Sequence, residues 1–140
     1  MIEEYKDNLF NCAPNSCLAH CVSQDYEMSK GIAVLFKKFF GRVFELHQQN
    51  KKVGECSLLS YPDGFIYYLV TKEKYWHKPT YKSLTSSLLD MKKHAVEHQV
   101  KIISMPRIGC GLDQLKWEEV KKILIEVFDG TEINICIYSL

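Results

Sequence analysis

The sequence predicts a single α/β domain built on a mixed sheet with helices on both faces. Strand-like apolar runs alternate with amphipathic segments along the 140 residues, which favours a mainly parallel sheet. One pair of runs is separated by Pro62-Asp63-Gly64, a turn signal that predicts an antiparallel hairpin. Because no linker, repeat or low-complexity stretch interrupts the chain, one domain accounts for its length.

The elements are assigned in chain order from apolar periodicity. We predict a strand at 17–22, helices at 30–40 and 42–49, hairpin strands at 55–60 and 65–71, a long helix at 81–98, a strand at 100–105, a helix at 117–128 and a strand at 133–138. Ser29 is a candidate N-cap of the first helix. The helical inner stripes are Ile32, Leu35, Phe36 and Phe39, then Leu84, Leu88, Met91 and Ala95, and finally Trp117, Val120, Leu124 and Val127.

The bulk composition excludes several functional classes. The formal net charge of +1 gives no electrostatic footprint for non-specific binding to nucleic acid or membranes. No apolar run approaches the roughly 18 residues of a membrane span, and residues 1–6 lack the features of a secretion signal. The six cysteines form no Cys-x-x-Cys pair, and several lie in apolar runs. We therefore expect reduced thiols, no zinc site and residence in the nucleus or the cytoplasm.

The strongest local signal for function is the segment from Pro106 to Asp113, which follows the strand at 100–105. Gly109 and Gly111 let the backbone approach a ligand and direct its amides at a phosphate. Taken alone, Gly-x-Gly more often marks a structural turn, and the strand–loop–helix context makes a ligand-binding loop an equal alternative. The segment matches neither a P-loop nor a dinucleotide fingerprint. Asp113 is either a capping aspartate before the next helix or a carboxylate for acid–base chemistry.

Three lysines follow the strand at 65–71, namely Lys72, Lys74 and Lys78. A lysine at a strand end is normally a solvated surface residue. A partly desolvated amine in its free-base form is instead a nucleophile. The spacing does not choose among the three.

The stretch from His94 to His98 matches the His-x-x-Glu-His pattern of one class of zinc peptidases. Both histidines share a helix face, as metal ligands must. No third ligand follows at helical spacing, and histidines are common near exposed helix C-termini. We therefore predict no metal and keep a metallopeptidase as the least favoured alternative.

Several stretches together resemble the macrodomains, and the likeness extends from Leu9-Phe10 to the last residues. The chain is most similar to the terminal ADP-ribose protein glycohydrolases, which also act as O-acetyl-ADP-ribose deacetylases. This resemblance implies a three-layer α/β/α sandwich around a mixed central sheet, with ADP-ribose as ligand and no cofactor. The most specific stretches are 18–21, 31–38, 67–72, 77–81 and 104–113.

The resemblance also implies residue roles. Lys72 matches the family's catalytic lysine and Asp113 its catalytic aspartate, which resolves the choice among the three lysines. In the family mechanism Lys72 attacks the anomeric carbon of the distal ribose and displaces a glutamate or aspartate carboxylate, while Asp113 handles protons. The matching ligand-binding positions, with Tyr138 near the adenine and the loop around the diphosphate and distal ribose, are Asn8, Leu9, Ser23, Arg107, Ile108, Gly109, Cys110, Gly111, Leu112 and Tyr138.

Two positions depart from the family pattern. Asn8 stands where relatives commonly have an aspartate that accepts a hydrogen bond from the adenine amino group, so we expect weaker adenine binding. Met28-Ser29-Lys30-Gly31 replaces a Met-Gly-Ala-Gly loop. The Ser29 and Lys30 side chains would narrow the distal ribose site, or Lys30 would add a cation near the diphosphate or a nucleic-acid carrier.

Two functions follow from these observations. The first is a hydrolase that removes terminal ADP-ribose from proteins, from an acetyl ester or from nucleic acid. The second is a reader module that binds ADP-ribose without cleaving it. The expected partners are ADP-ribose and ADP-ribosylated proteins, with ADP-ribosylated nucleic acid as an alternative carrier and no membrane. We expect the protein to be a monomer.

Overall fold

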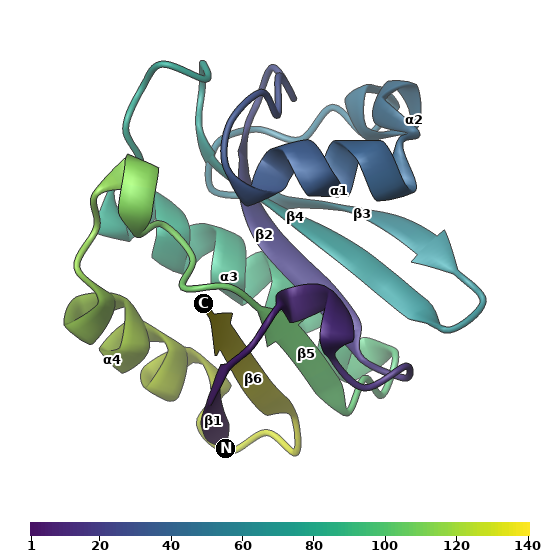
Figure 1. The fold of residues 1–140 in the computed structure, drawn as a ribbon, viewed down its shortest axis with the longest axis vertical. Helices are drawn as coiled ribbons and strands as arrows, with labels where there is room; N and C mark the ends of the chain where they lie inside the picture. Colours follow the sequence, from purple (N-terminus) through teal and green to yellow (C-terminus); the bar gives the residue numbers. More distant parts are fainter.

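The computed structural model describes all 140 residues and shows a six-stranded sheet between two layers of helices (Figure 1). This confirms the predicted α/β sandwich with a mixed sheet. No helix combines the length and apolar character that a membrane span requires. The elements are β1 (Ile2–Lys6), η1 (Leu9–Asn11), β2 (Cys17–Ser23), α1 (Ile32–Phe40), α2 (Val43–Gln48), β3 (Cys56–Tyr61), β4 (Gly64–Lys72), α3 (Tyr81–Glu97), β5 (Ile102–Met105), η2 (Gly111–Asp113), α4 (Trp117–Phe128) and β6 (Asn134–Ser139).

The strands lie in the order β1-β6-β5-β2-β4-β3, and only β3 runs antiparallel to its neighbour. Tyr61 pairs with Gly64, so Pro62 and Asp63 form the predicted hairpin turn. The carboxyl ends of the parallel strands meet at one edge of the sheet. Ligands bind at this edge in open α/β folds, so the topology indicates where to look for a site.

The two faces of the sheet are covered by different helix pairs. The predicted inner stripe of α3 is fully buried, and it packs with α4 on the face that carries Tyr67 and Leu69. Phe36 of α1 and Leu46 of α2 are buried on the opposite face with Tyr68. Successive residues of β4 thus enter different cores, as the two-residue period of a strand requires.

The prediction for the inner face of α1 was partly wrong. Phe36 is fully buried, but Leu35 and Phe39 are 38% and 54% exposed. Phe36 fills the space beside His20, with ring centroids 3.7 Å apart, whereas Phe39 contacts Phe10 edge-on outside the core. The expected N-cap at Ser29 was also wrong, because the helix is preceded by Gly31 and no side chain caps it.

The edge strand β1 was not predicted from the sequence. Ile2 is its only partly buried residue, and the following four are exposed, so no apolar alternation reveals it. It pairs with β6 in parallel, with Glu4 opposite Ile137. Edge strands are commonly charged and short, which explains why hydrophobic periodicity misses this one.

Adjacent leucines of α3 test the assignment of the core. Leu88 is fully buried, while Leu89 is 50% exposed. We expect Leu88→Ala to lower the free energy of unfolding by about 2–5 kcal/mol, because it leaves a cavity in the core. Leu89→Ala is the matched control and should change it by at most about 0.5 kcal/mol. Urea denaturation of both variants measures the difference, and equal effects would contradict the α3 packing.

Candidate active site

Two oppositely charged side chains meet at the carboxyl edge of the sheet. Lys72 ends β4, and Asp113 ends η2 beyond β5. Lys72 Nζ lies 2.7 Å from Asp113 Oδ1, and the side chains are only 13% and 18% exposed. The structure therefore pairs Asp113 with Lys72. The alternative interpretation of Asp113 as a cap is wrong, because α4 begins at Trp117 with Lys116 as its N-cap and no side chain caps it.

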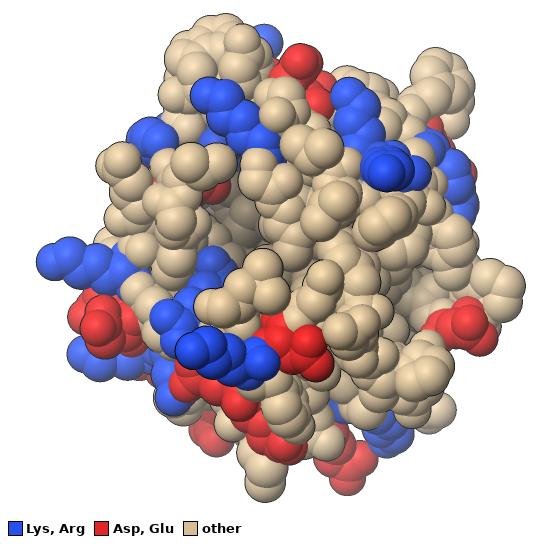
Figure 2. All heavy atoms as spheres, in the orientation of Figure 1, with Lys and Arg blue, Asp and Glu red and all other residues tan.

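The pair faces a cavity of about 540 Å³. In the space-filling view this face of the molecule is hollowed, with basic side chains beside the hollow (Figure 2). The volume falls in the usual range for small-molecule sites. The lining comes from the end of β2 and the loops that follow β2, β4 and β5, at residues 20–23, 28–33, 72, 75, 76, 78 and 106–113.

The loop after β5 contributes mainly backbone to the cavity. Gly109 and Gly111 have φ of 72° and 71°, a region that favours glycine. A Cβ atom at Gly109 would also lie 2.7 Å from Leu115 Cδ1. Ile108 is 2% exposed and packs in the core, so only its backbone can reach a ligand. The loop thus presents peptide groups, as expected for a site that binds phosphate.

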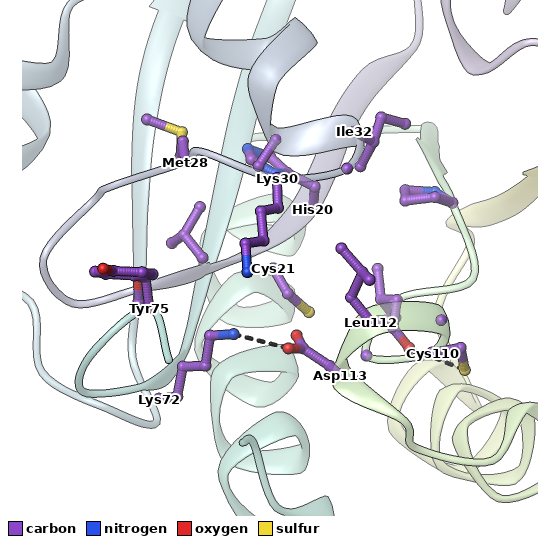
Figure 3. A pocket seen from close by; sticks show the side chains of 18 of the residues that line it. His20, Cys21, Met28, Lys30, Ile32, Lys72, Tyr75, Cys110, Leu112 and Asp113 are labelled. Carbon is purple, nitrogen blue, oxygen red and sulfur yellow. Dashed lines mark hydrogen bonds and ion pairs between the residues drawn. The ribbon is translucent and has the colours of Figure 1, made fainter. Parts of the chain in front are cut away.

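The side chain of Leu112 extends over the cavity toward the loop after β2 (Figure 3). It is 61% exposed, and its Cδ1 lies 3.5 Å from the position of a Cβ atom at Gly31. Lys78 Nζ donates a hydrogen bond of 2.7 Å to the Leu112 carbonyl. Lys78 therefore positions η2, while Lys74 does not line the cavity. The structure thus separates the three lysines that the spacing left equivalent.

Arg107 is held at the back of the loop by a residue that sequence reasoning missed. Its Nη2 lies 3.6 Å from Glu4 Oε1, and its guanidinium lies over the Trp117 ring at 5.4 Å. Glu4 also accepts hydrogen bonds from Lys121 Nζ and Trp117 Nε1. The hydrogen bond from Lys121 is the main reason that the pKa of Glu4 is lowered. No local signal marks Glu4, because its partners lie more than 100 positions away along the chain.

Asp25 was also missed, and it joins two of the loops around the cavity. It accepts hydrogen bonds from the Ser23 hydroxyl and from the Tyr75 amide, the latter at 3.1 Å. Burial disfavours the charged form of Asp25, but these hydrogen bonds outweigh it and lower its pKa. Ser23, a predicted ligand contact, lines the cavity while its hydroxyl is engaged by Asp25.

The two thiols that line the cavity are poor nucleophiles. Burial, reinforced by the charge of Asp113, raises the pKa of Cys21 to about 12. Burial also raises the pKa of Cys110. Since the thiolate is the reactive form of cysteine, neither side chain competes with the Lys72 amine at neutral pH.

His20 lines the cavity but is not suited to acid–base chemistry. It is 1% exposed, and neither ring nitrogen has a hydrogen-bond partner. Its ring stacks on Phe36 and meets Tyr68 edge-on. Burial lowers its pKa from 6.5 to about 3, so it stays neutral and acts as a packing residue.

His20 makes stability depend on pH. Below pH 6.5 the unfolded chain binds a proton at this imidazole, whereas the folded chain does not until about pH 3. Stability therefore falls as the pH decreases through this window, by roughly 1.4 kcal/mol per pH unit from this group. We expect His20→Leu to weaken the decline in unfolding free energy between pH 6.5 and 4.5. His47→Leu, which removes an exposed imidazole, is the control and should show the same decline as the wild type. If the decline in His20→Leu also equalled that of the wild type, the neutral state of His20 would be refuted.

Three predicted contacts lie outside the cavity, at the carboxyl ends of β1 and β6. Tyr138 stacks on Tyr5 with ring centroids 5.1 Å apart. Asn8 Oδ1 accepts a hydrogen bond of 2.9 Å from the Phe10 amide and so caps η1. Leu9 is 3% exposed in the core. Their contacts with a ligand stay predictions.

The two histidines near the end of α3 lie away from this cavity. Their rings stack at 3.9 Å, and His94 Nδ1 lies 2.7 Å from the Tyr67 hydroxyl. Burial, followed by the charge of His98, lowers the pKa of His94. The chain contains no group of three or more His, Cys, Asp or Glu residues that could hold a metal ion.

A three-layer sandwich with a ligand cavity at the carboxyl ends of its central strands is the architecture of a macrodomain. The Macro domain family matches residues 19–124, and the chain belongs to this family. It is 52% identical to the human protein named ADP-ribose glycohydrolase OARD1, over 96% of this chain and 89% of that protein. Among solved structures, the macrodomain of Thermus aquaticus DarG has a TM-score of 0.88 at 24% identity and covers 100% of this chain and 99% of that one. Thermosipho africanus DarTG, solved in complex with ADP-ribose, has a TM-score of 0.80 at 22% identity over 96% of this chain and 40% of that one.

Proposed function

We propose that this chain is an ADP-ribose glycohydrolase that releases terminal ADP-ribose from modified carriers. Lys72 is the nucleophile, and Asp113 accepts and returns protons. The observation that carries the proposal is the 2.7 Å pair of these two largely buried side chains at the edge of the cavity. The human relative at 52% identity, whose name is ADP-ribose glycohydrolase, supports the same activity.

The chemistry of the cavity suits ADP-ribose. Its lining includes four cationic side chains and one carboxylate, Asp113, which favours a ligand that carries a diphosphate. The backbone between Gly109 and Leu112 supplies amides for the diphosphate and distal ribose. Asn8 and Tyr138 lie at the neighbouring strand ends, where the adenine would bind. The ADP-ribose complex of the Thermosipho relative supports this choice of ligand.

Transfer to Lys72 is the first chemical step. The ammonium of Lys72 passes a proton to Asp113 across their 2.7 Å contact, which makes the amine a free base. Its nitrogen then forms a bond to the anomeric carbon of the distal ribose. The bond from that carbon to the carrier oxygen breaks, and the electron pair leaves with the carrier.

Hydrolysis of the adduct completes the cycle. Asp113 first releases to solvent the proton that it took from Lys72. The nitrogen of the adduct passes a proton to the ring oxygen as the ring opens to an iminium, and water adds to its carbon with the Asp113 carboxylate as the base. Collapse of this intermediate breaks the carbon–nitrogen bond, releases ADP-ribose and returns the proton to Lys72. The neutral thiols of Cys21 and Cys110 play no part in these transfers.

Esters of glutamate and aspartate are the carriers that we propose first. Their carboxylates leave readily as anions, and the same displacement would release acetate from ADP-ribose that carries the acetyl group on its anomeric oxygen. ADP-ribosylated nucleic acid is a further carrier, supported by a Thermus aquaticus relative named DNA ADP-ribosyl glycohydrolase. That relative is 25% identical over 99% of this chain, which spans 41% of its length.

A panel assay tests the proposal and separates it from a reader function. Purified protein is incubated with ADP-ribosylated protein, acetyl-ADP-ribose and ADP-ribosylated DNA, and released ADP-ribose is quantified. Turnover of at least one carrier supports the hydrolase. Micromolar or tighter binding of ADP-ribose in calorimetry, with no turnover of any carrier, would instead establish a reader. The observation that favours a reader is the loop at Ser29 and Lys30, which differs from the glycine-rich loop of the family.

A further inference from the structure

Four basic side chains line the cavity, and three of them have partners. Lys72 pairs with Asp113. The ammonium of Lys78 donates to the Leu112 carbonyl, and Arg107 is held by Glu4. Lys30 is the fourth, and its ammonium makes no hydrogen bond or ion pair within the chain. It is therefore the cation that remains free to meet a charge brought by the ligand.

The direction of the Lys30 side chain is informative. It leaves the loop before α1 and extends into the cavity, and its amine is directed toward Lys72 and Asp113 (Figure 3). The positive charge of Lys30 thus lies toward the end of the cavity where the bond to the carrier would break. Lys30 is an exposed residue, so its ammonium keeps contact with water while it is directed at the reacting end of the cavity.

We propose that Lys30 is a catalytic residue that stabilises the carrier oxygen as it leaves the anomeric carbon. This assignment rests on the proposed function, in which Lys72 forms the new bond to that carbon. When the carbon–oxygen bond breaks, its electron pair moves to the leaving oxygen, which gains a full negative charge. The Lys30 ammonium donates a hydrogen bond to this oxygen and keeps its own proton.

The other polar groups of the lining have other parts in this step. Asp113 carries the proton taken from Lys72, and Lys72 becomes the bonded nitrogen. Lys78 donates a hydrogen bond to the Leu112 carbonyl, and the Arg107 guanidinium lies between Glu4 and the Trp117 ring. A cation close to a developing negative charge accelerates a reaction because its attraction for that charge is stronger in the transition state than in the ground state. The benefit increases as the leaving group becomes less acidic, so Lys30 would extend the range of carriers.

The test compares leaving groups of graded acidity. ADP-ribose derivatives with different phenols on the anomeric carbon of the distal ribose are hydrolysed by the wild type, Lys30→Met, Lys30→Arg and Lys38→Met. Lys38 is the matched control because it is an exposed lysine of α1 outside the cavity lining. We expect Lys30→Met to lower kcat about tenfold for acidic phenols and roughly 100-fold for the least acidic. Lys30→Arg should recover part of the loss, and Lys38→Met should match the wild type.

Calorimetry with ADP-ribose alone separates the outcomes. If Lys30 acts on the leaving group, Lys30→Met binds this product within about twofold of the wild type. Weaker product binding, with an unchanged dependence of kcat on phenol acidity, would place Lys30 at the diphosphate and overturn the assignment. An unchanged dependence with unchanged binding would overturn it as well. If the wild type cleaves none of the derivatives and none of the carriers, both the proposed function and the assignment of Lys30 are rejected.

Discussion

Lys72→Ala is expected to reduce the release of ADP-ribose from modified protein by roughly 10³-fold or more, because it removes the nucleophile. Binding of ADP-ribose should remain within a few-fold of the wild type. The ligand would be held mainly by the backbone of the loop after β5, and this loop keeps its hydrogen bond from Lys78 and its buried Ile108 when Lys72 is removed. Single-turnover hydrolysis of automodified protein measures the first quantity, and calorimetry with ADP-ribose measures the second.

Lys74→Ala is the control for this variant. Lys74 lies two residues further along the chain, is exposed and does not line the cavity. We expect it to hydrolyse at the wild-type rate. If Lys72→Ala were as active as Lys74→Ala, an attack by Lys72 on the ribose would be excluded.

Asp113→Asn should have the second largest effect, a loss of about 10²–10³-fold in kcat. The asparagine preserves the shape of the side chain but cannot take the proton that Lys72 must lose before it attacks. It also removes the base that activates water for release of the adduct. Pre-steady-state and steady-state rates on the same substrate measure both consequences.

Asp63→Asn provides the control for Asp113→Asn. Asp63 is an exposed aspartate in the hairpin turn between β3 and β4, on another part of the chain. It should leave kcat unchanged, and both variants should melt within a few degrees of the wild type. Full activity of a folded Asp113→Asn variant would remove Asp113 from the mechanism.

The architecture was largely predictable because most elements carry their own signal. The stripe from Leu84 to Ala95 has helical spacing and is fully buried in α3. The turn at Pro62 and Asp63 predicts the hairpin, which is the one antiparallel pair of the sheet. The edge strand β1 has no such signal, because its polar side chains face solvent and its backbone pairs with β6 at the far end of the chain.

The site was harder to predict from the sequence, because its residues meet only through contacts between distant parts of the chain. Lys72 and Asp113 are 41 positions apart, and only the parallel arrangement of β2, β4 and β5 brings their strand ends together. Spacing left Lys72 equivalent to Lys74 and Lys78, and the choice came from the resemblance to macrodomains. In the structure Lys72 alone of the three pairs with Asp113, and its role as the nucleophile stays a prediction.

The residues that support the site were not predictable. Glu4 holds Arg107 from β1, and Asp25 joins the loops after β2 and β4. Each acts through contacts that are distant in sequence, and acidic residues of this kind are usually solvated. A local pattern therefore cannot distinguish them from the other surface carboxylates.

The central claim is that Lys72 forms a covalent bond with the ribose. Wild-type protein is mixed with an ADP-ribosylated carrier, the imine is reduced with cyanoborohydride, and peptides are sequenced by mass spectrometry. We predict that ADP-ribose is attached to Lys72 in the wild type and that no such adduct forms in Lys72→Ala. Efficient turnover with no adduct on Lys72, or an adduct on Lys30 or Lys78 instead, would contradict the account.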